Sequence, residues 1–330
     1  MEQFRTVVSV PIFRRPINLK QPILTLGSCF SDAIGIRLQQ AKFTTMVNPF
    51  GTIYNPVSIH KLLHYAINDE TAPPHTYLQQ ADIHLNYDFH SCFSALTKQE
   101  LQEQIRLKLS ECHRFLQTSE WLMITYGTAW VYEHVETGDI VANCHKVPAR
   151  VFQKKLLRID DIVKSFESLY VSIRRYYPAL RIIMTVSPVR HIKESLPLNN
   201  VSKSALRLAC HAIMEKFPDV EYFPAYEIMT DDLRDYRFYK TDMIHPTEQA
   251  EDYIWERFQE STFDESTKKF VIEWKSIQTA LRHRPFHRSS SGHQNFLKQI
   301  ILKLEQIQDR VNVDAEVTAL KKQLNTKIEN

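Results

Sequence analysis

The stretch Ile23-Leu24-Thr25-Leu26-Gly27-Ser28-Cys29-Phe30-Ser31-Asp32 decides the fold of this chain. Its first four residues form a short, mostly apolar run that ends at Gly27, and this pattern predicts a buried strand. Ser31 and Asp32 then indicate the beginning of a helix, because hydroxyl and carboxylate side chains cap free backbone N–H groups at helix starts. A buried strand that turns at a glycine into a helix begins a βαβ unit.

The alternation of strand and helix continues along the chain. Apolar runs predict further strands at residues 43–47, 121–126, 180–186 and 220–223, and helical patterns lie at residues 56–67, 97–118, 159–177, 201–217 and 246–258. Buried strands separated by helices predict an α/β fold with a mostly parallel sheet. Ligands bind at the carboxyl ends of such strands, and Gly27, Gly127 and Ser187 all lie at these ends.

Two segments indicate strands outside the central sheet. Residues 81–90 alternate apolar and polar side chains, with His84, Asn86, Asp88 and His90 on the polar face, which predicts a half-exposed strand. Residues 130–135 and 140–144 flank a turn sequence and predict a hairpin.

The composition excludes several classes of protein. With 330 residues and 43% hydrophobic side chains, the chain can form one α/β domain with an appendage. A net charge of +3 gives no reason to expect nucleic acid, and no apolar run is long enough to span a membrane. We see no signal peptide and no Cys-x-x-Cys pair, so we expect a cytoplasmic protein without disulfides, metal or cofactor. Its five cysteines are Cys29, Cys92, Cys112, Cys144 and Cys210.

The composition changes near the C-terminus. We assign residues 1–262 to the α/β domain, 263–295 to a helix and a basic, Ser-rich linker, and 296–330 to a C-terminal helix or coiled coil with a break at residues 312–314. Apolar residues recur every three or four positions from Leu297 to Val311 and again from Val317 to Leu324. This spacing predicts a short coiled coil that joins two copies of the chain, or equally a single amphipathic helix that folds back on the domain. On the first interpretation, residues beyond Gly292 are dispensable for folding of the α/β domain.

The segment Asp242-Met243-Ile244-His245-Pro246 is the strongest chemical signal. A carboxylate three residues before an imidazole can bond it across one turn, fix its tautomer and leave the other ring nitrogen as a general base. Pro246 favours a helix start directly after the pair.

A candidate nucleophile lies at the first strand end. Gly27-Ser28-Cys29 precedes a helix, whose N-terminus favours a thiolate or a developing oxyanion. We expect Cys29 to have a lowered pKa and to react before the other four cysteines. Backbone N–H groups after Gly127 could line an oxyanion hole. The alternative is that these are ordinary turns around a packed cysteine.

These motifs resemble the SGNH/GDSL hydrolase superfamily and, more narrowly, the GSCFA domain family. Similar family motifs stand in the same order at residues 26–31, 48–51, 126–130, 185–189 and 242–246. The resemblance implies a three-layer, flavodoxin-like α/β fold. It also implies that Cys29 takes the place of the superfamily's serine nucleophile and Ser28 that of the preceding aspartate. The oxyanion-hole asparagine falls on Ala129, so Asn48 or the N–H groups of Gly51 and Gly127 would have to serve.

The resemblance implies an acyl-ester hydrolase or acyltransferase acting on an acylated small molecule or glycan. Cys29 would attack the carbonyl, with Ser28 as the alternative nucleophile, and His245 and Asp242 would complete the triad. Arg190 and His191, just past a strand end, would contact the substrate. The competing hypotheses are a catalytically degenerate binding protein and an assembly protein with a hydrolase-like domain.

Overall fold

A computed structural model describes residues 6–287 and 290–325 of the chain. Its central sheet has five strands in the order β10-β9-β5-β1-β2, and every neighbouring pair is parallel. This is the doubly wound order of a flavodoxin-like fold, so the predicted fold class is confirmed. The strands are β1 (Ile23–Gly27), β2 (Thr45–Val47), β5 (Trp121–Tyr126), β9 (Arg181–Val186) and β10 (Val220–Tyr222).

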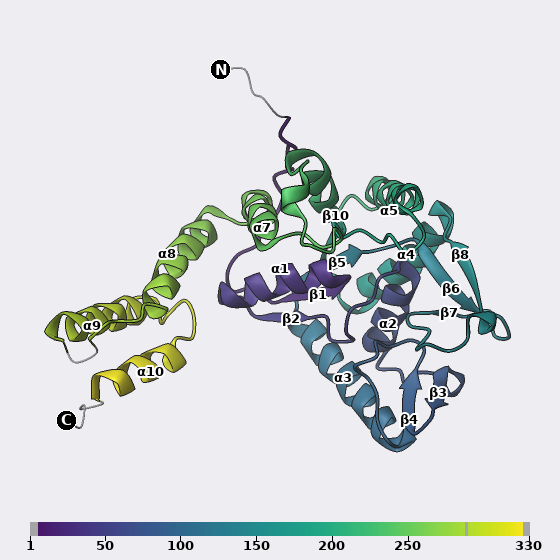
Figure 1. Cartoon of the computed structure of the whole chain (residues 1–330), viewed down its shortest axis with the longest axis horizontal. Helices are drawn as coiled ribbons and strands as arrows, with labels where there is room; N and C mark the ends of the chain where they lie inside the picture. Colours follow the sequence, from purple (N-terminus) through teal and green to yellow (C-terminus); the bar gives the residue numbers. More distant parts are fainter. Residues whose placement is uncertain (1–5, 288–289, 326–330) are drawn as a thin grey trace.

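Helices cover both faces of the sheet (Figure 1). Successive strand residues point to opposite faces, so each apolar strand presents side chains to the helices on both sides. On β5, Leu122 and Ile124 belong to one buried cluster, and Trp121 and Met123 belong to the other. The first cluster includes residues of α2 (Pro56–Asn68), α3 (Lys98–Thr118), α4 (Ile159–Tyr176) and α5 (Leu196–Lys216). The second includes residues of α1 (Cys29–Gln40) and α7 (Glu248–Thr262).

Two small antiparallel sheets lie outside the central one. The predicted hairpin is present as β6 (Trp130–His134) and β7 (Ile140–Val141), but β8 (Phe152–Leu156) joins it as an unpredicted third strand. The predicted strand near residue 85 is β4 (Ile83–Asn86), which pairs with the unpredicted β3 (Tyr77–Gln80). Short helical turns complete the fold: α6 (Ala225–Glu227), η1 (Pro74–Thr76), η2 (Ala149–Val151), η3 (Ile228–Asp232) and η4 (Tyr236–Phe238).

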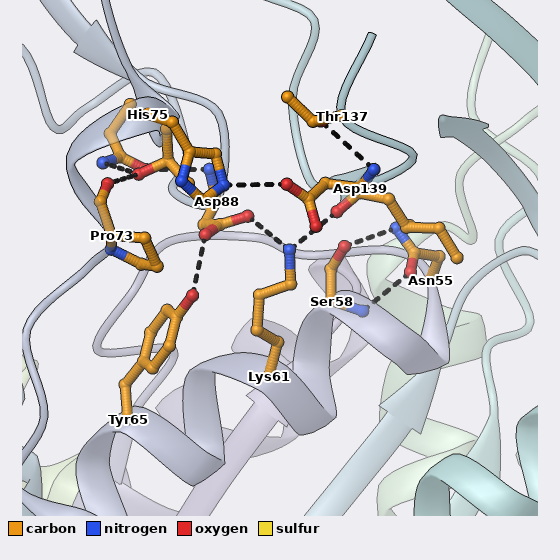
Figure 2. Close-up of polar contacts among 12 residues, drawn as sticks. Asn55, Ser58, Lys61, Tyr65, Pro73, His75, Asp88, Thr137 and Asp139 are labelled. Carbon is orange, nitrogen blue, oxygen red and sulfur yellow. Dashed lines mark hydrogen bonds and ion pairs between the residues drawn. The ribbon is translucent and has the colours of Figure 1, made fainter. Parts of the chain in front are cut away.

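The polar face predicted for residues 81–90 is wrong at two positions. Asn86 and Asp88 are buried, with 0% and 2% of their surface exposed. Figure 2 shows why Asp88 tolerates burial: its carboxylate accepts hydrogen bonds from Lys61 Nζ at 2.8 Å and from the Tyr65 hydroxyl at 3.1 Å. Both donors come from α2, so the local alternation could not reveal them.

The C-terminal region is an arm of three helices, α8 (Glu265–Leu281), α9 (Ser291–Glu305) and α10 (Asp314–Asn325) (Figure 1). The apolar stripe of α9 is buried within the chain, with Leu304 0% exposed, where α9 packs against α8 and α10. Self-association through this stripe stays a prediction. The break predicted at residues 312–314 lies between α9 and α10, which ends the first helix at Glu305 and begins the second at Asp314. Residues 288–289 of the predicted linker, and the terminal residues 1–5 and 326–330, lie outside the described residues.

The arm also contacts the α/β domain directly. The indole Nε1 of Trp274 donates to the carbonyl of Gln40 at 2.6 Å, and Lys42 Nζ pairs with Glu316 at 2.6 Å. These bonds attach α8 and α10 to the end of α1. The arm therefore contacts the α/β domain through side chains of α8 and α10. That residues beyond Gly292 are dispensable for folding stays a prediction.

Candidate active site

The turn from β1 into α1 depends on Gly27. Its φ of +136° is rarely adopted by residues with a side chain, and a Cβ there would lie 2.1 Å from the carbonyl oxygen of Thr125. The next residue, Ser28, donates its backbone N–H to the same carbonyl at 3.1 Å. The turn is thus held against β5, and it places Cys29 at the first position of α1.

Ser28 and Cys29 have different surroundings. Ser28 is fully buried, and its side chain caps α1 by accepting the N–H of Phe30 at 3.4 Å. Cys29, by contrast, lines a cavity of about 280 Å³ together with His245. The structure brings the predicted thiol and imidazole to one cavity and leaves Ser28 in the protein interior.

His245 is held by Asp242 as the spacing predicts. Asp242 Oδ2 bonds His245 Nδ1 at 2.7 Å, and Asp242 Oδ1 accepts the N–H groups of Ile244 and His245 at 2.9 and 3.0 Å. The backbone N–H of His245, followed by its ring, lowers the pKa of the Asp242 carboxyl, so the aspartate stays ionised. The prediction that Pro246 opens the following helix is wrong, because α7 begins at Glu248 with Thr247 as its cap.

The electrostatics of Cys29 differ from the prediction. Burial raises the pKa of the Cys29 thiol, and the nearby Asp32 carboxylate raises it further, while Lys203 and the thiol's own backbone N–H oppose the rise. The expected lowering by the helix N-terminus is therefore wrong in direction. At neutral pH the resting group is the thiol, which needs a base to become a nucleophile.

We expect alkylation of Cys29 to follow this raised pKa. The rate of its reaction with iodoacetamide, followed by mass spectrometry, should rise with pH through a midpoint above that of an exposed model thiol. Cys29→Ser protein serves as the control, because it leaves the exposed Cys92 as a source of background labelling. A midpoint below the model thiol would mean that an imidazolium holds Cys29 as a thiolate at rest.

The predicted oxyanion donors are already in use. The N–H of Gly51 donates to the carbonyl of Asn48 at 2.8 Å, and that of Gly127 donates to the carbonyl of Tyr54 at 2.8 Å. The side chain of Asn48 accepts the N–H of Gly27 and donates to Asp32, both at 2.8 Å. These residues hold the turns of the site together, and the structure does not support the oxyanion role predicted for them.

Arg190 contacts the turn that carries His245, residues 242–246, and its side chain is engaged there. Its Nη1 donates to the carbonyl of Met243 at 3.3 Å, and its backbone N–H donates to that of Ile244 at 3.2 Å. Its guanidinium lies 3.8 Å from the centre of the Tyr239 ring. Met243 has a φ of +58°, an unfavourable conformation for this residue, so the bond to its carbonyl helps to hold the turn.

We expect Arg190→Ala to impair the geometry of the catalytic pair rather than substrate binding. Because small displacements of a catalytic group are costly, kcat should fall about tenfold or more while KM changes little. Steady-state kinetics on any ester that the protein hydrolyses would measure both, with the exposed Arg234→Ala as the control. A rise in KM at constant kcat would restore the original substrate-contact prediction.

His191 lies near the site in an uncharged form. Its ring meets the Tyr54 ring edge-on at 5.1 Å, and burial lowers its pKa to about 3. Its Nε2 is buried and has no hydrogen-bond partner among the described residues. The predicted substrate contact therefore stays a prediction, restricted to a neutral imidazole.

Lys203 was not predicted. It is 1% exposed, and its Nζ donates to the carbonyls of Gly127 at 2.8 Å and Ser187 at 2.7 Å. It thus joins the carboxyl ends of β5 and β9 beneath the turn that carries Cys29, and burial lowers its pKa to about 7. The available signal was a lysine in the apolar stripe of its helix, in line with Leu206 and Cys210.

Residues 6–287 and 290–325 contain no candidate membrane span and no metal-binding cluster. No helix there is both long and apolar enough to cross a membrane. In the same residues, no three side chains of His, Cys, Asp or Glu are grouped so that they could hold a metal ion.

Comparison with known protein families identifies the chain. The GSCFA family profile matches residues 22–258, which include the Cys29 turn and the Asp242–His245 pair. The chain belongs to the GSCFA family. The profile of the GSCFA C-terminal domain matches residues 274–326, which correspond to most of the helical arm. A search of curated proteins finds no match for this GSCFA protein.

Solved structures similar to this GSCFA protein are distant. A platelet activating factor protein from Streptococcus pneumonia is 14% identical in sequence, and the match covers 73% of this chain and 83% of that one with a TM-score of 0.39. A carbohydrate esterase family 3 protein from Talaromyces cellulolyticus is 9% identical in sequence. The match covers 78% of this chain and 99% of that one, with a TM-score of 0.36. A family two carbohydrate esterase from Clostridium thermocellum is 13% identical in sequence. The match covers 78% of this chain and 66% of that one, with a TM-score of 0.37.

Proposed function

We propose that this protein is an acyl-ester hydrolase or acyltransferase that uses Cys29 as its nucleophile. The observation that carries the proposal is that Cys29 and His245 line one cavity while Asp242 holds the Nδ1 of that histidine at 2.7 Å. This arrangement leaves Nε2 of His245 as the base, with an ionised carboxylate to stabilise the imidazolium.

The reaction proceeds in two steps. His245 Nε2 takes the thiol proton as Cys29 Sγ bonds to the ester carbonyl carbon, and the carbonyl π electrons move to oxygen. The intermediate then expels the alcohol oxygen, which takes the proton from His245, and a thioester remains on Cys29. Water or an acceptor alcohol then attacks the thioester carbon and gives its proton to His245. The C–S bond breaks, Cys29 Sγ takes the proton back from His245, and the free acid or the transferred ester leaves.

The raised pKa of Cys29 decides how the thiol is activated. Because burial keeps the sulfur protonated at neutral pH, proton removal by His245 accompanies attack, as with a serine hydroxyl, rather than preceding it. The backbone N–H of Cys29, at the first position of α1, is the donor that we assign to the developing oxyanion, with the helix N-terminus adding to it.

The cavity suits a small acyl group with a polar acceptor. Its volume is about 280 Å³, and apolar side chains such as Ile36 and Val189 share its wall with charged ones. Arg37, Lys240 and Glu251 are the charged residues at this wall. We therefore infer an acylated small molecule or glycan as the substrate, with the acyl chain against the apolar wall.

The test is capture of the acyl-enzyme. The full chain would be incubated with a panel of short-chain activated esters and thioesters, and intact mass and peptide mapping would locate any added acyl group. We expect one acyl group on Cys29 and release of the alcohol, and neither with Cys29→Ala. Turnover without modification of Cys29, retained in Cys29→Ala, would refute the mechanism.

A second candidate is a binding protein that has lost turnover. It is favoured by the commitment of the Gly51 and Gly127 N–H groups to carbonyl acceptors and by the raised pKa of Cys29. Saturable binding of an ester from the panel without acylation of Cys29 would support this second function against the first.

A further inference from the structure

A second cavity lies at the opposite edge of the sheet from Cys29. Its volume is about 430 Å³, and its walls include Arg181, which begins β9, and Glu221 of β10. Because the strands are parallel, their amino ends face away from the edge that carries Cys29 and Ser187. The cavity is large enough for a small metabolite, and no step of the proposed reaction uses it.

Positive charge is in excess in this cavity. Four arginines and two carboxylates line it. Arg174 is paired with Asp219, and the backbone N–H of Arg14 donates to Glu221 at 2.9 Å. Asp219 is thus paired with a guanidinium, whereas Glu221 accepts a backbone N–H and has no ion pair within residues 6–287 and 290–325.

The guanidinium groups of the other three arginines form no ion pair within residues 6–287 and 290–325, although Arg14 and Arg181 lie near enough to Glu221 to oppose the rise that burial causes in the pKa of its carboxyl. Within residues 6–287 and 290–325, Arg15 and Arg181 form no ion pair with a carboxylate. Arg181 lies with its guanidinium 5.1 Å from the centre of the Trp121 ring, and its Nε is buried without a hydrogen-bond partner in these residues. A buried N–H without an acceptor is costly, so the Arg181 guanidinium is suited to donate to an oxyanion that enters the cavity.

The remaining wall is apolar. Pro178, Ala179, Leu180 and Pro218 lie beside the arginines. A guanidinium presents a planar fork of N–H donors that matches the oxygens of phosphate. We propose that this cavity binds a small phosphate monoester, with its phosphate against Arg15 and Arg181 and its apolar part against the proline and leucine side chains.

The test is isothermal titration of the full chain with phenyl phosphate at constant ionic strength. We expect saturable binding at one site, and no comparable binding of benzyl alcohol, which has the ring without the anion. Arg15→Ala and Arg181→Met should each weaken binding about tenfold or more, as expected for loss of a charge-assisted hydrogen bond. Arg15 is exposed, so its variant should fold even if Arg181→Met does not.

The matched control is Arg175→Ala. Arg175 is exposed, adjacent to Arg174, and stacks on Tyr176 without lining the cavity. The affinity of the Arg175→Ala protein for phenyl phosphate should equal that of the unmodified chain. Absence of binding to the unmodified chain, or equal weakening by Arg15→Ala and Arg175→Ala, would overturn the proposal. The titration does not involve Cys29, so its result is independent of the proposed catalysis.

Discussion

Cys29→Ala should abolish ester turnover, while Ser28→Ala should leave it within a few-fold of the unmodified protein. Loss of a nucleophile in an acyl-transfer site removes about a thousandfold or more of the rate. Ser28 is the matched control because it is the neighbouring residue and the other candidate. It is fully buried and caps α1 with its side chain, so its replacement should lower stability by about 1 kcal/mol without touching the reacting atoms.

The measurement is kcat/KM on the best ester of the panel, with the thermal midpoint of each variant recorded alongside. A thiol-blocking reagent should reproduce the effect of Cys29→Ala on the unmodified chain. If Ser28→Ala eliminates turnover while Cys29→Ala and the thiol reagent have no effect, the protein is a serine esterase with a displaced nucleophile.

The features that sequence predicted correctly are those that neighbouring residues determine. The β1–α1 turn follows from an apolar run that ends at a glycine. Its capping residue is Ser28, and the predicted caps Ser31 and Asp32 lie inside the first turn of α1. The bond between Asp242 and His245 follows from a separation of three residues. The parallel sheet follows from the repeated alternation of strand and helix, and its order confirms the flavodoxin-like class.

The features that sequence missed depend on partners that are distant in the chain. Lys203 is bound by a carbonyl 76 residues away, and Arg190 donates to a carbonyl 53 residues away. The alternating pattern of residues 81–90 predicts an exposed Asp88, but Asp88 is buried and pairs with Lys61 of α2, 27 residues earlier in the chain. The pKa of Cys29 rises mainly because the fold buries the thiol, which no local pattern reveals, and Asp32, three residues along α1, raises it further.

The arm poses the same problem, because its apolar spacing fits either a partner copy or the chain itself. The structure places this stripe inside the chain, so we expect the arm to contribute to the stability of the monomer. Deleting residues 283–330 should expose the apolar side chains of α8, including the 3%-exposed Trp274, and give an aggregating or unfolded protein.

A matched pair of single substitutions tests this more sharply than truncation. Leu304 and Leu302 both lie on α9, but Leu304 is 0% exposed and Leu302 is 51% exposed. Leu304→Ala should lower the free energy of unfolding by about 2–5 kcal/mol, since it opens a cavity in the core. Leu302→Ala should change it by less than about 0.5 kcal/mol.

The unfolding midpoint of each variant, measured by calorimetry at several protein concentrations, distinguishes the two interpretations. An internal core makes the loss in Leu304→Ala independent of concentration, whereas a coiled coil between copies makes the midpoint rise with concentration. Equal stability of the two variants would mean that α9 does not pack as the structure shows.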